Sequence, residues 1–251
     1  MKKVLPALLL IGLFAVRCTP PAQQNSGKLS FAISFSPTLS DRPQDGRIIL
    51  LLATKDKPEP REQFNFQLHT QLGFGIDVDT LKPGKEIILD ESAFGFPIRS
   101  IKSIPAGDYF VQAVINRYET YTLKTGKTVK LPPDQGEGQH WNQKPGNFYS
   151  RPFKVHIDPA NPEQIKVVMD QKIAPLPEPK ETKYVKHIKI QSKLLSDFWG
   201  KPTYLGAHVL LPEGFEEHPN ARYPLMIYHG HFPSDFGGFS TEPPPPGMDT
   251  T

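Results

Sequence analysis

Proline and glycine interrupt this chain so often that little room remains for long helices. The sequence has 28 prolines and 19 glycines among its 251 residues. Proline lacks the N–H group that a helix interior needs. Many of these residues stand in short turn-forming groups, namely DRPQDG, KPGK, PAGD, KTGK and DPANP, and such groups set the backbone angles of a chain reversal. We therefore expect a mostly β protein with short strands and many turns.

The segments between these turns have the patterns of strands. Residues 29–35, LSFAISF, alternate strictly between large apolar and small residues, which predicts a half-buried strand. Further strand patterns cover residues 47–53, 86–89, 108–115, 128–131, 153–157 and 164–169. This number and spacing of strands predict an antiparallel β-sandwich of the immunoglobulin or fibronectin type over residues 28–172.

The N-terminal segment has the features of an export signal. Lys2 and Lys3 precede an apolar run that is too short to span a bilayer as a mature helix,. Residues 1–18 are therefore interpreted as a signal peptide, followed by a loose tether over residues 19–27. Cys18 stands where a lipoprotein signal places its acylated residue, whereas Arg17 departs from the small residue expected there. Two outcomes stay open, a lipid anchor on Cys18 or simple cleavage, and both predict a periplasmic, outer-membrane or secreted protein.

The charge balance argues against an electrostatic partner. The chain has 29 basic and 26 acidic residues, and loss of residues 1–18 removes Lys2, Lys3 and Arg17, so the formal net charge falls from +3 to zero. No long basic run remains, and we expect no nucleic-acid partner. Cys18 is the only cysteine, so the exported protein must be stabilised by its core and not by disulfides.

A second region follows a proline-rich boundary. Residues 173–183 include APLPEPKETK and have no apolar periodicity, which is typical of a stiff linker. After them, the patterns predict strands over residues 184–191 and 204–211 with a short helical turn between them. A third, strongly apolar strand is predicted over residues 223–228, and the second region is assigned to residues 184–251.

Two features of the first region have a functional and a structural interpretation. The segment 132–152 is long and polar but contains Trp141, which either belongs to a sugar- or peptide-binding loop or anchors the loop to the sandwich,. Asp77 and Asp79 share one face of an extended segment. They are either a pair of calcium ligands or, since calcium takes six to eight oxygens, a solvated edge.

The sequence AHVLLPEGFEEHPNARYPLMIYHGHFP, residues 207–233, resembles the opening of the α/β-hydrolase fold in esterases of the enterochelin-esterase and esterase-D type. The shared features are the LPEGF turn, the RYP that begins an apolar strand and the His-Gly at the end of that strand. The earlier segments GIDVDTLKPGKEIIL, IPAGDYFVQAVINRYETY and GNFYSRPFKVHID resemble the N-terminal sandwich of bacterial exported esterases. The resemblance implies the first strands of an incomplete α/β-hydrolase domain over residues 184–251.

In that fold, the loop after the third strand supplies part of the oxyanion hole, where fixed N–H groups stabilise the negative charge of acyl transfer. The resemblance assigns this loop to Gly230, His231 and Phe232. Because His231 replaces the second glycine of the usual His-Gly-Gly, the donor N–H is either that of His231 or that of Phe232.

The nucleophile of such an enzyme is missing. The sequence contains no G-x-S-x-G elbow, and the nearest candidate, Ser240 in GFSTE, lacks the second glycine,. The expected function is therefore the N-terminal part of an exported serine hydrolase that acts on an ester or related acyl bond. It would need no cofactor or metal, it would take a small or oligomeric ester substrate, and this chain alone would be inactive. The alternative is an exported β-sandwich binding or scaffold protein.

The histidines allow one more interpretation. His229 and His231 lie on the same side of an extended segment, where they either share a zinc ion with His208 or His218 as a third ligand, or cap the strand end through backbone hydrogen bonds.

Overall fold

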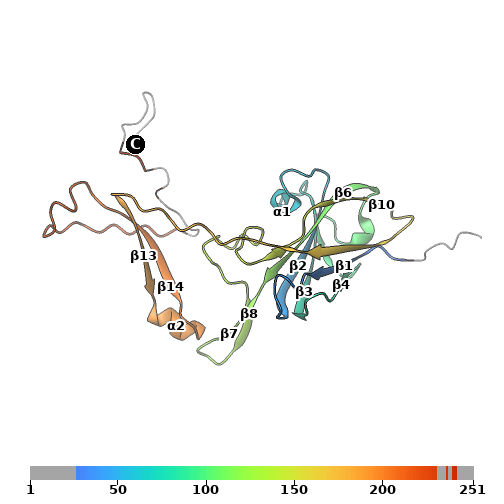
Figure 1. Ribbon diagram of the computed structural model, residues 1–251, viewed down its shortest axis with the longest axis horizontal. Coiled ribbons are helices and arrows are strands. Elements are labelled where there is room, and N and C mark those ends of the chain that lie inside the picture. The colour runs from blue at the N-terminus through green and yellow to red at the C-terminus, as the bar shows by residue number, and fades with distance from the viewer. Residues whose placement is uncertain (1–26, 231–235, 237–238, 242–251) are drawn as a thin grey trace, which may run out of the picture.

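A computed structural model describes residues 27–230, 236 and 239–241 of this chain (Figure 1). Strands dominate, as the turn pattern predicted. Most of them form a β-sandwich, which is the blue-to-yellow part of the ribbon. A β-hairpin with one short helix, drawn in orange, lies beyond a long extended connection. Cys18 and the rest of the signal and tether lie outside the described residues, apart from Gly27.

The larger sheet of the sandwich has the strand order β12-β9-β6-β2-β3-β5, with β10 also paired to β6. All of its pairs are antiparallel. Its strands are β2 (Gln44–Ala53), β3 (Leu72–Leu81), β5 (Phe94–Phe96), β6 (Gly107–Arg117), β9 (Phe148–Tyr149), β10 (Phe153–Ile157) and β12 (Gln171–Lys172). The sheet includes β3, β5, β9 and β12, which the sequence patterns did not predict.

The smaller sheet has the order β11-β1-β4, with bounds β1 (Ser30–Phe35), β4 (Ile87–Leu89) and β11 (Gln164–Met169). β1 pairs antiparallel with β4 but parallel with β11. The prediction of a purely antiparallel sandwich is therefore wrong for this pair. Only Asp170 separates β11 from β12, so the chain passes from one sheet to the other at that residue.

The core lies between these two sheets. Alternate residues of β1, β2 and β6 are fully or almost fully buried and belong to one cluster, namely Phe31, Ile33, Phe35, Ile48, Leu50, Leu52, Val111, Ala113 and Ile115. Since successive side chains of a strand point to opposite faces, this pattern places the core on one face of each sheet. Burial of a side chain of this size contributes about 1.5–3 kcal/mol.

The second face of the larger sheet is also covered at its centre. The short helix α1 (Pro60–Gln63) contacts β2 and β6. Gln112 of β6 is fully buried there, and its amide oxygen accepts a hydrogen bond from the backbone N–H of Arg61 at 2.9 Å, while its amide nitrogen donates to Glu59 Oε2 at 3.0 Å. A polar residue can therefore occupy the sheet because its hydrogen-bonding groups have partners.

Strand β1 is buried on both faces, so the prediction of a half-buried strand is wrong. It is the central strand of its sheet, so Ala32 lies between Lys166 of β11 and Ile88 of β4 in the register. Glu86 and Lys166 form an ion pair of 3.4 Å between the two flanking segments. Alternation in the sequence shows which face of a strand is apolar, whereas the burial of its other face also depends on the position of the strand in its sheet.

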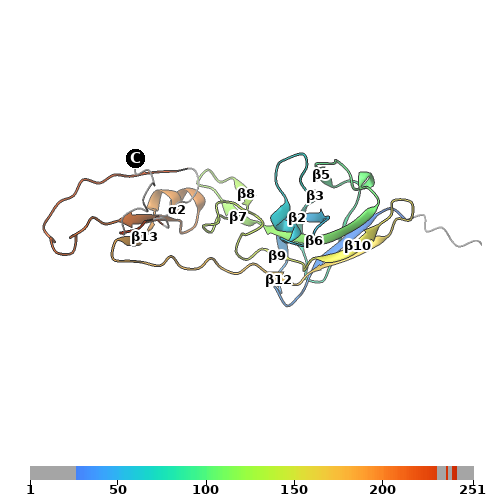
Figure 2. The ribbon, with the colours of Figure 1, turned by 90° about the horizontal axis from the view of Figure 1, so that it is seen from above.

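A two-stranded hairpin of β7 (Glu119–Thr122) and β8 (Thr128–Leu131) extends from the sandwich toward the C-terminal region, and both views place it there (Figures 1 and 2). Helix α2 (Lys193–Trp199) meets it. The rings of Tyr121 and Trp199 lie 5.4 Å apart, and Lys201 Nζ donates to Glu119 Oε2 at 2.6 Å. The remaining helical element is the 3-10 turn Ile101–Ser103.

Strands β13 (Val185–Gln191) and β14 (Tyr204–Leu210) lie on either side of α2, as the sequence predicted, and the structure shows that they pair antiparallel. The hydroxyl of Ser192 caps the helix by accepting from Leu195 N, and Gly200 ends it in the left-handed conformation at φ 69°. These two residues explain where the predicted helical turn begins and ends.

The predicted strand at residues 223–228 does not form. Residues 221–230 have no strand pairing, and four consecutive apolar side chains are exposed, namely Leu225 at 82%, Met226 at 91%, Ile227 at 80% and Tyr228 at 82%. A strand needs a neighbour for its backbone N–H and C=O groups, and no described residue provides one. Within the described part of the chain, no helix has the length and apolarity that crossing a membrane requires.

Candidate functional site

The residues assigned to the oxyanion loop lie at the edge of the described structure. Gly230 is half-buried and belongs to no helix or strand, whereas His231 and Phe232 lie outside the described residues. Ser240 is described and exposed. The assignment of these residues to a hydrolase therefore stays a prediction.

The other predicted histidine ligands do not gather. His208 of β14 pairs across the hairpin with His187 of β13, and their rings lie 4.4 Å apart. His229 is exposed in the unpaired segment. Residues 27–230 and the few described beyond them contain no group of three or more His, Cys, Asp or Glu side chains that could hold a metal ion.

The two candidate calcium ligands have cationic partners instead. Both lie on β3, which the sequence did not predict as a strand. Asp77 accepts from Arg47 Nη1 at 2.8 Å, and Asp79 accepts from Lys130 Nζ at 2.8 Å. These pairs connect β3 to its neighbour β2 and to the β7-β8 hairpin.

Trp141 anchors its segment to the sandwich, which agrees with the second of the two interpretations. Its ring lies 6.3 Å from that of Phe64, and its carbonyl accepts from Asn147 Nδ2 at 2.8 Å. The segment is not only a loop, because Phe148 and Tyr149 form β9 at the edge of β6. It also forms part of a pocket.

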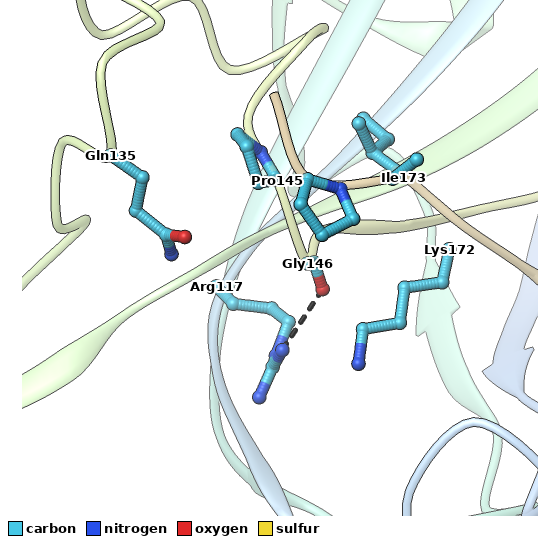
Figure 3. A pocket seen from close by; sticks show the side chains of 8 residues that line it. Arg117, Gln135, Pro145, Gly146, Lys172 and Ile173 are labelled. Atoms are coloured by element: carbon cyan, nitrogen blue, oxygen red, sulfur yellow. Dashed lines mark hydrogen bonds between the residues drawn. The ribbon is translucent and has the colours of Figure 1, made fainter. Parts of the chain in front are cut away.

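This pocket, of about 490 Å³, is on the sandwich at the end of β6 (Figure 3). Its walls come from the end of β6, the segment before β9, and the chain that leaves β12. The lining residues are Arg117, Gln135, Pro145, Gly146, Lys172, Ile173, Ala174 and Pro175. The start of the predicted linker, residues 173–175, is therefore part of the sandwich surface.

Arg117 is held in a fixed orientation at the base of this pocket. Its Nε donates to Gln44 Oε1 at 2.6 Å and its Nη1 donates to the carbonyl of Gly146 at 2.9 Å. Its guanidinium lies over the ring of Phe148, 4.7 Å from the centroid. Burial lowers the pKa of the guanidinium from its ordinary value, while the charge of Glu119 opposes this shift; the group stays charged because an arginine pKa begins so high.

Backbone hydrogen bonds shape the pocket wall. Gly146 N donates to Ile173 O, and Ile173 N donates to Asn147 O, both at 2.9 Å. The buried side chain of Asn147 accepts from the N–H of Arg117 at 3.0 Å. Gly146 has φ 82°, a conformation that favours glycine,. These contacts join the segment before β9 to the chain after β12.

A buried lysine lies behind the wall. Lys144 is only 2% exposed, and its ammonium donates to the carbonyl of Arg117. Burial lowers the pKa of Lys144 to about 8, although the charge of Glu137 acts in the opposite direction. Glu137 is also buried, and its Oε1 has no hydrogen-bond partner among the described residues. Buried charges of this kind are costly.

A second, smaller pocket of about 260 Å³ lies on the β13-β14 hairpin. His187 and His208 line it together with Phe236 and Phe239, and its remaining lining residues are Pro179, Lys180, Thr182 and Val185. Its lining contains one lysine and no carboxylate, whereas the pocket at Arg117 has two cations in its lining.

Comparison with known proteins adds no identification. No protein-family model matches the chain, and no curated protein or solved structure matches it. The resemblance to hydrolases therefore depends on the residues quoted above.

The sequence drew attention to the segment 132–152 but not to the pocket that it forms. Arg117 stands just beyond the predicted strand 108–115, where the sequence gives an arginine no special role. Lys172 and Gln135 are distant from it along the chain. A weak signal was present in Gly146 and Asn147, which are typical of a tight turn just before the aromatic pair of β9.

Proposed function

We propose that this chain combines an exported β-sandwich of the immunoglobulin or fibronectin type with the first elements of a serine-hydrolase domain over residues 184–251. In the complete enzyme the domain would hydrolyse an ester or related acyl bond. Gly230, His231 and Phe232 would supply part of the oxyanion hole, and the catalytic serine, acid and histidine are not in this sequence. The chain alone is then catalytically inactive.

The observation that carries this proposal is the unpaired apolar segment at residues 225–228. Four consecutive large side chains, each at least 80% exposed, are unusual on a finished surface,. Such a run is typical of a strand buried on both faces of a mostly parallel sheet. The hydrolase fold provides that environment, because further strands and helices would cover the segment.

The β13-β14 hairpin supports the same conclusion. Its strands also expose apolar side chains, which include Ile188, Ile190, Leu205 and Leu210. A two-stranded hairpin is marginally stable in water unless a hydrophobic face packs on other elements. In the proposed domain, the hairpin and residues 223–228 would be neighbours in one sheet.

Export is part of the proposal and depends on residues 1–18. A lipid on Cys18 would anchor the protein to a membrane, and cleavage alone would release it. The predicted substrate is a small or oligomeric ester, and the chemistry needs no cofactor.

The decisive experiment is to read the coding DNA beyond codon 251. An open reading frame with a G-x-S-x-G elbow supports the proposal, while a stop codon at that point overturns it. For the longer protein, Ile227→Asp should lower the melting temperature by several degrees and reduce activity, because the side chain would be buried.

In the 251-residue chain, where Ile227 is exposed, the same change should leave thermal unfolding unchanged. Glu216→Asp, at an exposed position of the preceding turn, is the control in both proteins. Hydrolysis of a p-nitrophenyl ester by the 251-residue chain, abolished by Ser240→Ala, would contradict the assignment of the nucleophile to a missing segment.

The second candidate is an exported binding protein without catalysis. The pocket at Arg117 favours this second candidate. It is the larger of the two described pockets, and its lining residues all belong to the sandwich or to the first residues after it.

A further inference from the structure

We propose that the pocket at Arg117 binds a small organic carboxylate. The inference is independent of the hydrolase proposal, because all of the lining residues belong to residues 117–175. Four observations support it: converging donors, a cationic lining, an arginine oriented before binding, and an apolar wall beside the charged groups.

The donor groups of three lining residues converge. In Figure 3 the guanidinium of Arg117, the ammonium of Lys172 and the amide of Gln135 point toward the same open space. They come from three separate parts of the chain, at the end of β6, at β12 and before β9. Convergent polar groups in a concave site are the usual mark of ligand recognition.

The lining contains two cations and no carboxylate. The nearest acidic influence on Arg117 is that of Glu119, whose Oε2 is engaged by Lys201 at 2.6 Å. Lys144, behind the wall, contributes a further positive charge, which the buried Glu137 opposes. The open side of the pocket is therefore positive, and an anion entering it would meet no acidic side chain.

Arg117 is already oriented for an anion. Nε and Nη1 are engaged by Gln44 and Gly146, and the ring of Phe148 supports the plane of the group. No described residue accepts a hydrogen bond from Nη2. An arginine fixed by its own contacts loses little entropy on binding, and Nη2 is left to donate a charge-assisted hydrogen bond to a carboxylate oxygen.

The wall beside these donors is apolar and small. Pro145, Ile173, Ala174 and Pro175 form it, and the volume of about 490 Å³ lies in the range of small-molecule sites,. A carbon skeleton can contact this wall while its carboxylate reaches Arg117 and Lys172. Inorganic phosphate has no such skeleton, so we expect it to bind more weakly.

The test is a titration of the full chain by calorimetry and by amide chemical shifts, with hexanoate as the probe. Hexanamide is the uncharged control of the same chain length, and inorganic phosphate is the control anion without a carbon chain. Hexanoate should bind and shift the amide signals of Gly146 and Ile173. Equal binding of hexanamide, tighter binding of phosphate, or absence of hexanoate binding would each overturn the inference.

Two variants locate the site. Arg117→Gln should weaken hexanoate binding about tenfold or more, since a charge-assisted hydrogen bond is lost. Because Arg117 also holds the fold, Lys172→Glu is the second variant; its side chain is exposed, so it should abolish binding without changing the circular dichroism spectrum. Lys85→Gln, which removes an exposed cation outside the pocket, should bind hexanoate as the wild type does. Unchanged affinity in Lys172→Glu refutes the site.

Discussion

Replacement of Lys144 by methionine should remove a specific pH dependence of stability. The side chain is almost completely buried, and burial lowers the pKa of its ammonium from 10.5 to about 8. Each pKa unit corresponds to about 1.4 kcal/mol, so below pH 8 this lysine contributes about 3 kcal/mol less to the free energy of unfolding than it does above pH 10.5,. Methionine retains the apolar stem but has no charge.

The direction in which the free energy of unfolding changes with pH follows from proton binding. Because the native pKa is lower than that of the unfolded chain, the unfolded chain binds more protons between pH 8 and 10.5, and stability rises with pH in that window. Between about pH 7 and about pH 9.5, Lys144 should contribute a rise of about 2 kcal/mol in the free energy of unfolding. The Lys144→Met variant should lack this rise.

Urea unfolding at a series of pH values measures the effect. The difference between the two pH profiles isolates Lys144, because the other titrating groups are common to both proteins. Lys85→Met, which removes an exposed lysine, controls for the loss of one positive charge. Parallel profiles for the wild type and Lys144→Met would refute the argument that this ammonium is charged inside a dry site.

Three further outcomes are expected. Gly46→Ala should lower the free energy of unfolding by about 3 kcal/mol or more, measured by urea unfolding, because an added Cβ would lie 2.3 Å from a main-chain oxygen of β6. The control is Gly206→Ala, which should leave this free energy unchanged because nothing lies within 4 Å of the added Cβ. Ser192→Ala should destabilise α2 by about 1 kcal/mol, seen as faster amide exchange in that helix, while Ser192→Asp should retain the cap. Trp141→Ala should speed proteolysis between residues 132 and 147 through loss of the contact with Phe64; a cleavage rate equal to that of the wild type would contradict the anchoring role.

Strands were predicted correctly where the local sequence pattern was strong. The strands around Ile33, Leu50 and Val111 were predicted because apolar residues with β propensity run between clear turns. Strand β3 was not predicted, since Gly73 and Gly75 weaken its pattern,. Gly73 has a reason to be there, because a Cβ would lie 2.5 Å from the ring of Phe64.

The candidate site was less accessible to prediction. Gly230 and its neighbours were found through a short motif, which depends only on adjacent residues. The pocket at Arg117 depends on residues separated by tens of positions, and the hydrogen bond from Gly146 to Ile173 that forms its wall has no signature in sequence.

By itself, the sequence determined the β class, several of the strands and the short helical turn between residues 191 and 204. These depend on the conformational preferences of single residues and their immediate neighbours. Only the tertiary structure decided that β1 pairs parallel with β11, that residues 223–228 have no strand partner, and that Arg117, Lys172 and Gln135 face one another. Strand pairing and the lining of a pocket depend on which distant segments of the chain meet. Each needs hydrogen bonds or side chains from at least two separate segments.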